Sequence, residues 1–197
     1  MAKVRNEQRR RRILEATVRI VGREGPGAVT HRAIAAEAGV PLAATTYYFA
    51  SKEALFNEAL ILSVQSDLAE LEVLARSMAQ SPASVEAFAR SIATFLIAQL
   101  RRRRAIVVAQ YELALEAARR SSLRSTARAS TEAYVRLCEM MLARVGSPDP
   151  GGDARLLVAV MDGLLLDQLS APRSPFDADA LARQLRRFIA GLLLVPA

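Results

Sequence analysis

The chain has 197 residues, of which 52% are hydrophobic and 24% are charged, and 27 Lys and Arg against 20 Asp and Glu give a formal net charge of +7. This composition is too apolar for a disordered chain and too charged for a membrane-embedded one. The single cysteine, Cys138, excludes an intramolecular disulfide framework and a thiolate-rich zinc site, and the single histidine, His31, leaves almost no imidazole for catalysis. We therefore expect no enzyme, no cofactor and no bound metal.

The N-terminal region lacks the features of an export signal. Its basic start is followed by an apolar run over residues 13–21, but Glu15 and Arg19 interrupt that run, whereas the apolar region of a signal peptide is continuous. The longest apolar stretches lie within residues 156–166 and 188–196, and both are shorter than the ~20 residues of a membrane-spanning helix. The sequence thus predicts a cytoplasmic protein with no membrane partner.

Apolar residues recur at helical spacing along nearly the whole chain, which predicts an all-α fold of about nine helices. A first helix is expected over residues 7–23, stopped by Gly25 and the residues after it. A long helix capped by Ser51 is expected to reach about residue 78. Five further helices are expected over residues 84–102, 104–118, 123–145, 153–170 and 177–195.

Between the first helix and the long one, residues 30–49 show the pattern of a helix-turn-helix. Thr30 is a good N-cap for a helix that ends at Gly39, because glycine suits the left-handed residue that follows many helices. A short helix is then expected over residues 41–49, with Pro41 at its start, where a missing N–H costs nothing. In a helix-turn-helix the second helix enters the major groove of DNA.

A more specific pattern runs through residues 7–67. It consists of Ile13-Leu14-Glu15-Ala16, Val29-Thr30-His31-Arg32-Ala33-Ile34-Ala35, Ala38-Gly39-Val40 and Tyr47-Tyr48-Phe49-Ala50-Ser51-Lys52-Glu53-Ala54-Leu55. In order and spacing these stretches resemble the DNA-binding domain of TetR-type transcriptional regulators. Residues 68–197 resemble that family's ligand-binding and dimerisation domain only in length, helix count and apolar content. The resemblance implies an N-terminal helix-turn-helix domain over residues 7–67 joined to a C-terminal helical bundle that dimerises.

The resemblance also assigns DNA contacts to individual residues. Thr30 matches the family's phosphate-contacting cap, and Lys52 matches a phosphate-binding lysine at the start of the long helix. Thr46, Tyr47 and Tyr48 match positions of the recognition helix that touch bases and backbone. A helix N-terminus presents free N–H groups to an anion, and a nearby lysine adds a positive charge, so these assignments are physically consistent.

The predicted recognition helix departs from the commonest family pattern. Ala43 stands where a small Gly is usual, Thr45 where Leu or Ile is usual, and Thr46 where the first Tyr is usual. Residues 39–51 contain no Arg, Lys, Asn, Gln, Asp or Glu, although bidentate reading of bases relies mainly on Arg, Lys, Asn and Gln. We expect thin direct readout from the hydroxyls of Thr45 and Thr46, from tyrosine edges, and from thymine contacts of the methyl-bearing residues Leu42, Ala43 or Ala44. Much of the affinity is then expected to come from phosphates.

Residues 1–12 contain six Lys and Arg against one Glu, a net charge of +5 from six minus one. This composition predicts a basic arm, including Arg9 and Arg10, that follows phosphates or enters a narrow minor groove. The second arginine run, residues 101–104, is expected to be a plain surface at a helix junction. His31 is expected to be exposed, and Cys138 is expected to be a small core residue.

The helix expected over residues 153–170 is apolar on nearly all sides, so both of its faces must be covered. We therefore expect a two-fold homodimer through this helix and the one at 177–195, with the same patch on each subunit. The family resemblance implies the same arrangement. Such a dimer would place two recognition helices about 34–36 Å apart, so that they meet successive major grooves.

An effector pocket in the C-terminal helices is also implied by the resemblance. Pockets of this type are mostly apolar with a few polar groups that orient the ligand. The candidates of both kinds are Phe95, Gln99, Val107, Gln110, Tyr111, Tyr134 and Met141. A ligand that prefers a state with recognition helices too far apart would release the operator.

The sequence therefore favours a DNA-binding transcriptional regulator, most simply a repressor released by a small molecule. A same-fold activator, or a protein that binds DNA without an effector, stays open. Two alternatives come from other classes: a helical module whose basic face binds anionic membrane, and an enzyme. The helix-turn-helix spacing argues against the first, and the near absence of His and Cys argues against the second.

Overall fold

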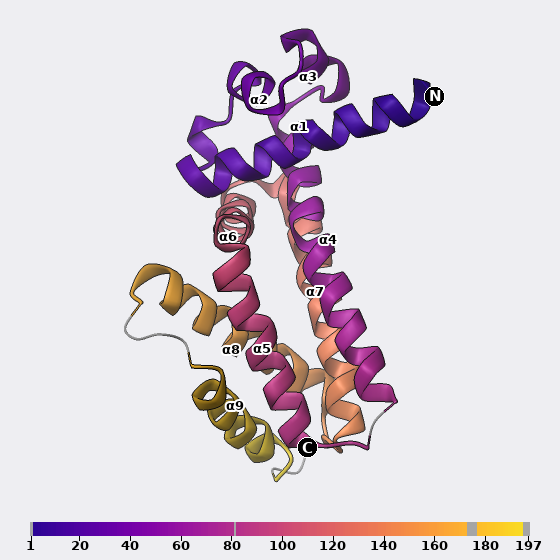
Figure 1. The fold of residues 1–197 in the computed structure, drawn as a ribbon, viewed down its shortest axis with the longest axis vertical. Coiled ribbons are helices and arrows are strands. Elements are labelled where there is room, and N and C mark those ends of the chain that lie inside the picture. Colours follow the sequence, from indigo (N-terminus) through magenta and orange to yellow (C-terminus); the bar gives the residue numbers. More distant parts are fainter. Residues whose placement is uncertain (1, 81, 173–176, 195–197) are drawn as a thin grey trace. The chain divides into compact units, whose positions relative to one another are not determined.

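The computed structural model describes residues 2–80, 82–172 and 177–194 (Figure 1). Over these ranges it contains nine α-helices, one short 3₁₀ helix and no strand, which confirms the predicted all-α fold. The elements are α1 (Ala2–Glu24), η1 (Pro26–Ala28), α2 (His31–Ala38), α3 (Leu42–Tyr48), α4 (Lys52–Ala79), α5 (Val85–Arg102), α6 (Arg104–Arg119), α7 (Ser121–Arg144), α8 (Pro150–Ser170) and α9 (Ala178–Leu192).

The helix ends differ from the predicted ones in a few places, each with a local cause. Helix α1 begins at Ala2, because the arginine-rich residues before position 13 continue the helix. Pro41 is the N-cap of α3 and precedes the helix. Helix α8 begins at Pro150, since the Asp149 carboxylate accepts the Gly152 N–H at 3.0 Å and caps the first turn. The predicted end of the last helix, Val195, lies outside the described residues.

The chain divides into two compact units. The first comprises residues 1–66 and 105–130, and the second comprises residues 67–104 and 131–197. Helices α4 and α7 each contribute to both units, and α6 belongs to the first apart from its first residue. The sequence places a domain boundary after residue 67, close to the first division, but it assigns residues 105–130 to the C-terminal domain.

In the first unit, α1 packs against α2 and η1, and α2 packs against α3 (Figure 1). Four large side chains from different elements fill its core, namely Ile13, Ile34, Phe49 and Phe56, each at most 2% exposed. The backbones of α1 and α6 approach closely at Gly22, where a Cβ atom would overlap the carbonyl oxygen of Ala105. Helix α6 therefore packs on the helix-turn-helix region through backbone contact.

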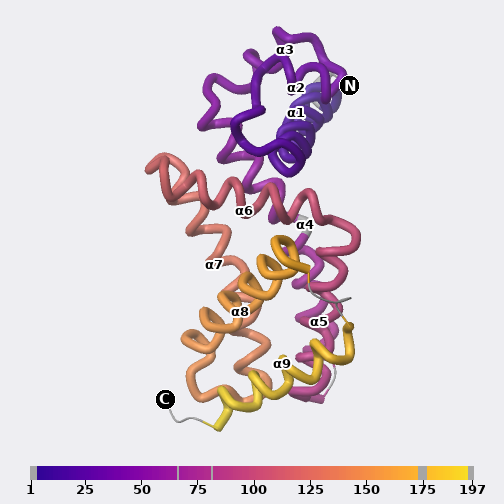
Figure 2. Tube along the Cα trace, turned by 90° about the vertical axis from the view of Figure 1, so that its left-hand side faces the viewer, coloured from indigo at the N-terminus to yellow at the C-terminus, as the bar shows by residue number. Residues whose placement is uncertain are grey.

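In the second unit, α9 lies along α5 at close range, and α5 also contacts α8 (Figure 2). Small buried residues, Ala89 and Ala93 of α5 and Ala182 of α9, allow this close approach. Helix α9 supplies Leu181, Leu185 and Ile189 to the core, and all three are buried. Within the described residues, no helix combines the length and hydropathy needed to cross a membrane.

Candidate functional site

The caps of the helix-turn-helix are those that the sequence predicts. The Thr30 hydroxyl accepts the Ala33 N–H at 3.1 Å and caps α2. Gly39 ends α2 in the left-handed conformation with φ of 61°, and the Val40 N–H returns to the carbonyl of Ala35 at 3.0 Å. Glycine adopts this conformation without strain. The turn therefore sets the direction of α3 through backbone geometry that the sequence encodes locally.

Helix α3 has an outward face and an inward face. Leu42, Ala43, Thr46 and Tyr47 are exposed, and Tyr47 reaches 77% exposure. Successive positions are one, three and one residues apart, so the four side chains form a single strip on the helix surface. We call this set of four residues the α3 strip. The α3 strip is uncharged and mostly apolar or aromatic, and all four of its residues are exposed to solvent.

Thr45 is a predicted DNA contact that the structure contradicts. Its side chain is 1% exposed, and its hydroxyl donates to the Leu42 carbonyl at 2.7 Å and lies 3.0 Å from Nδ1 of His31. His31 is accordingly half-buried, whereas we expected it to be exposed. Thr45 and Thr46 are neighbours on α3, so their side chains point in different directions from the helix axis. The structure buries Thr45 and exposes Thr46.

The two tyrosines of α3 have different surroundings. Their rings meet edge to face, with centroids 5.0 Å apart. The Tyr48 hydroxyl donates to Oδ1 of Asn6 at 2.8 Å, and its side chain is half-buried. Tyr48 thus ties the end of α3 to the first turns of α1 and supports Tyr47, which points outward.

The basic N-terminal residues are helical from Ala2, so the predicted basic arm consists of the first turns of α1. Arg, Gln and Glu favour helices, and Arg11 and Glu15 add an i,i+4 ion pair at 2.8 Å. Arg12 turns back to α2 and donates to the Ala38 carbonyl at 2.6 Å, where it satisfies an acceptor at the helix end.

Arg10 is held within its own unit. Its guanidinium pairs with the Glu58 carboxylate and lies 5.4 Å from the centroid of the Phe49 ring. This arrangement positions α1 against α4 and makes Arg10 a structural residue in the described state. Arg9 is half-buried one residue earlier on the same helix. The side chain of Lys3, part of the predicted arm, lies outside the described residues.

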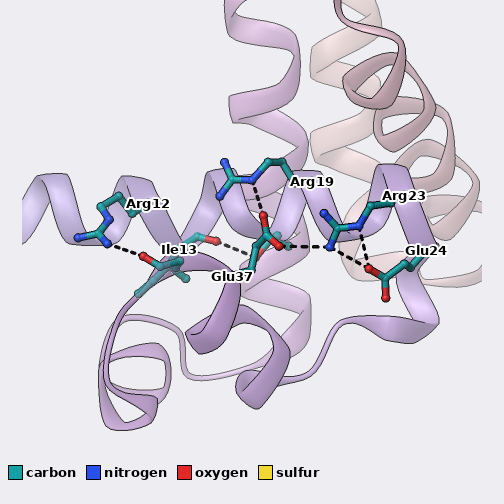
Figure 3. A network of polar contacts seen from close by, with 8 residues as sticks. Arg12, Ile13, Arg19, Arg23, Glu24 and Glu37 are labelled. Atoms are coloured by element: carbon teal, nitrogen blue, oxygen red, sulfur yellow. Dashed lines mark hydrogen bonds and ion pairs between the residues drawn. The ribbon is translucent and has the colours of Figure 1, made fainter.

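A second ion-pair network joins α1 to α2 (Figure 3). Glu37 accepts hydrogen bonds from Arg19 at 2.7 Å and from Arg23 at 3.2 Å, and Arg23 also pairs with Glu24 at 2.8 Å. The hydrogen bond from Arg19, followed by that from Arg23, lowers the pKa of Glu37 below its usual value. The two arginines therefore hold α2 against α1 by charge as well as by packing.

The start of α4 carries Lys52, which is half-buried with its ammonium 5.3 Å from the centroid of the Phe56 ring. Arg120, just after α6, contacts the same ring at 5.7 Å and pairs with Glu53 of α4 at 2.8 Å and Glu116 of α6 at 2.6 Å. This cluster ties the end of α6 to the first turn of α4.

The predicted effector residues fall into the two units. Val107, Gln110 and Tyr111 belong to the first unit, where Val107 is buried and Gln110 donates to the Ser63 carbonyl at 2.7 Å. Phe95, Gln99, Tyr134 and Met141 belong to the second unit, where Met141 is packed in the core at 1% exposure. Cys138 is buried beside it, as predicted, and burial raises the pKa of its thiol to about 12.

In the second unit the structure connects Gln99 and Tyr134 through three residues that the sequence analysis missed. We call Asp67, Glu70, Gln99, Arg103 and Tyr134 the α4–α5 polar cluster. The Asp67 carboxylate, 3% exposed, pairs with the Arg103 guanidinium and accepts the Tyr134 hydroxyl at 3.2 Å. Gln99 Nε2 donates to Glu70 at 3.3 Å. Burial, and then the Asp67 charge, raise the pKa of Tyr134, so it stays a hydroxyl donor.

The position of Arg103 differs from the prediction that residues 101–104 form a plain surface at a helix junction. Residues 101 and 102 of the second arginine run are exposed, as expected for a junction surface. Arg103, however, is 16% exposed at its side chain and neutralises a buried carboxylate. The sequence contains an indication of this ion pair, because Asp67 lies on the apolar face of α4 between Val64 and Leu71. A carboxylate buried on such a face requires a positively charged or hydrogen-bonding partner.

Two hollows open on the second unit. One of about 550 Å³ is lined by α4, α7 and the start of α8, with Leu68 and Met140 in its wall. The other, of about 370 Å³, lies between α4 and α5 and includes Glu70 and the predicted residue Phe95. Within the described ranges, no three His, Cys, Asp or Glu side chains come together as a metal site would require.

Comparisons with known proteins match both parts of the chain. Residues 13–59 match the family model for bacterial regulatory proteins of the tetR family, and residues 83–193 match the model for the tetracyclin repressor-like C-terminal domain. No match was found among curated proteins.

Solved structures resemble the chain over nearly its whole length. The multidrug binding protein EbrR complexed with imidazole is 34% identical, with 96% of this chain and 97% of that chain covered and a TM-score of 0.71. The same protein complexed with ethidium is 36% identical, with coverages of 91% and 96% and a TM-score of 0.67. A TetR family member from Streptomyces coelicolor is 35% identical, with coverages of 91% and 96% and a TM-score of 0.74. With an N-terminal helix-turn-helix, a helical C-terminal part and matches to both family models, the chain belongs to the TetR family of DNA-binding transcriptional regulators.

Proposed function

We propose that this regulator is a repressor that uses the α3 strip to read its operator and is released by a small-molecule effector. The observation that carries the DNA-binding part is the exposed, rigidly backed α3: Tyr47 points outward while Thr45 and Phe49 anchor the helix to the core. Because the strip holds no charge, phosphate contacts by Thr30, Lys52 and the exposed basic residues of α1 supply much of the affinity. The protein would act in the cytoplasm.

The proposed assembly is a homodimer through α8 and α9. In each chain, the proposed boundary between the DNA-binding domain and the C-terminal domain lies after residue 67. Support comes from the outer side of α8, where Leu156 is 48% exposed, Leu166 is 53% exposed, and Ala159 and Gly163 lie between them. These positions share one side of the helix. A row of exposed apolar and small residues is costly in water and suited to a second copy of itself.

We propose that the effector binds in the second unit and belongs to the planar aromatic cations. The relatives supply this support, because structures of EbrR contain ethidium, proflavin and malachite green. Among the predicted effector residues, Phe95, Gln99 and Tyr134 are the ones that meet a hollow or the polar cluster of that unit. An activator of the same fold is the alternative, and the direction of the effect on transcription separates the two.

Fluorescence anisotropy with a labelled duplex from the chain's own promoter region tests the DNA-binding proposal. Tyr47→Ala should weaken specific binding by about 1–3 kcal/mol, the range for losing one base contact, while leaving thermal stability unchanged because Tyr47 is exposed. Leu115→Ala is the matched control, since Leu115 is 56% exposed on α6. Equal affinities for the two variants, or no preference of the wild-type chain over random DNA, would refute the proposed surface.

A further inference from the structure

Helix α3 has little buried side-chain surface with which to hold its own orientation. It contains seven residues, and an isolated helix of that length is marginal in water. Its buried residues are Ala44 and Thr45, and both side chains are small. Its N-cap, Pro41, makes no side-chain hydrogen bond. Phe49, 2% exposed, anchors the C-terminal end, so the first turns of α3 depend on contacts with neighbouring elements.

A hydrogen bond from α2 reaches α3 at its buried polar side chain. The Thr45 hydroxyl, 1% exposed, donates its proton to the Leu42 carbonyl at 2.7 Å and lies 3.0 Å from Nδ1 of His31. Because the hydroxyl has a single proton and the carbonyl takes it, Nδ1 of His31 is the donor in the second contact. His31 therefore satisfies a buried acceptor that would otherwise be left unpaired at a cost in free energy.

His31 is itself held in a well-defined place. It is the first residue of α2, and the Thr30 hydroxyl caps that turn by accepting the Ala33 N–H at 3.1 Å. A continuous path of hydrogen bonds and backbone thus leads from the cap of α2, through the imidazole, to the first turn of α3. Successive helix residues point about 100° apart, so a contact that fixes Thr45 inward also fixes the direction in which Tyr47 points outward.

We infer that His31 is a positioning residue for DNA recognition, because its bond to Thr45 sets the rotation of α3 and so the direction in which the α3 strip meets the bases. This inference rests on the proposed use of that strip. Thr45 is buried, so a change to its hydroxyl reaches the bases only through the orientation of α3. Base contacts depend on that orientation, whereas phosphate contacts made from α1, α2 and α4 do not. His31 therefore acts on specificity more than on total affinity.

Fluorescence anisotropy with the promoter duplex, and with a random-sequence duplex of the same length, tests this role. Thr45→Val replaces the hydroxyl with a methyl group, and His31→Leu removes the donor. Each should weaken promoter binding about tenfold, the upper end for one neutral hydrogen bond, and change random binding less than about twofold. The double variant should also lose about tenfold, and not about a hundredfold, because both substitutions remove the same bond.

Two conservative variants separate positioning from a direct phosphate contact and from a loss of folding. Thr45→Ser keeps the hydroxyl, and His31→Asn keeps an N–H donor near the place of Nδ1, so both should retain most of the promoter preference. If His31→Leu does not fold, as judged by circular dichroism, the comparison of Thr45→Val with Thr45→Ser decides the matter. Promoter and random binding that weaken equally in both His31 variants would show a phosphate contact and overturn the inference.

The outcome for Tyr47→Ala distinguishes failure of this inference from failure of the proposed function. Promoter affinities that stay at the wild-type value in Thr45→Val and His31→Leu, while Tyr47→Ala weakens binding, would overturn the positioning role and leave the proposed DNA-reading surface standing. Wild-type promoter affinity in all three variants would overturn both.

Discussion

Among the glycines of the first unit, Gly22 has the least space for a side chain. Its α-carbon faces the backbone of Ala105, and a methyl group there would overlap the Ala105 carbonyl. A backbone group cannot rotate away as a flexible side chain can, so α1 and α6 would have to separate. The close contact thus links the helix-turn-helix region to α6 at a single small residue.

We predict that Gly22→Ala destabilises the protein by about 1–3 kcal/mol, the usual cost of overpacking. The matched control is Gly27→Ala, because a Cβ at Gly27 would meet no atom within 4 Å. Urea unfolding followed by circular dichroism measures both variants. A Gly22→Ala variant as stable as the control would mean that α1 and α6 are not held at this contact.

At the residue scale, the sequence predicts backbone features better than side-chain partners. The caps at Thr30 and Gly39 depend on neighbouring residues, and both occur as predicted. The inward rotation of Thr45 depends on His31 in another helix, and the pair of Asp67 with Arg103 joins residues 36 positions apart. Such contacts depend on how the helices pack, which local patterns do not specify.

At the element scale, α6 is the helix whose place could not be predicted from the chain order. In chain order α6 lies within the expected C-terminal domain. However, Gln110 donates a hydrogen bond to the Ser63 carbonyl and Arg120 pairs with Glu53, and both partners belong to the first unit. Helical periodicity gave the helix itself, with its start at Arg104. The two polar residues that tie it to α4, Gln110 and Arg120, carry no periodic signal.

Glu116 near the end of α6 gives a pH dependence whose sign can be stated. Hydrogen bonds from Arg119, and further ones from Arg120, lower the pKa of Glu116 in the folded protein. The unfolded pKa is about 4.3, so the resulting stabilisation is complete at neutral pH. It is lost as the pH falls below about 4.3 and through the lowered folded value.

We therefore predict that Glu116→Gln lowers the free energy of unfolding by about 1.5–3 kcal/mol at pH 7, the scale of a charged hydrogen bond. The difference from wild type should shrink as the pH approaches 3. Glu112→Gln, on the same helix, controls for the loss of one negative charge. Urea midpoints at several pH values provide the measurement, and a difference that stays constant with pH would count against the ion pair.

At the scale of the whole molecule, the proposed function requires two chains, because a single recognition helix spans one half-site. Fold class and family follow from the sequence, since helical periodicity and the residues of the helix-turn-helix are distributed along the chain. The surface of α8 that would contact a second chain is less evident from the sequence. Helix α8 is apolar on most sides, and burial shows that Leu157, Met161 and Leu165 face the core while Leu156 and Leu166 do not.

Leu166→Glu should convert the proposed dimer to a monomer, because it places two charges in one self-complementary patch. The matched control is Leu115→Glu, which introduces the same charge at an exposed position of α6. Light scattering after size-exclusion chromatography gives the mass of each variant. A dimer that survives Leu166→Glu would move the interface away from the outer side of α8.

Hydroxyl-radical footprinting on the promoter region is the most direct test of the central claim, that two copies present α3 to successive major grooves. We expect two protected patches about 10 base pairs apart or a multiple of that spacing, both weakened together by Tyr47→Ala and by Leu166→Glu. A single patch, or protection that neither substitution affects, would contradict it.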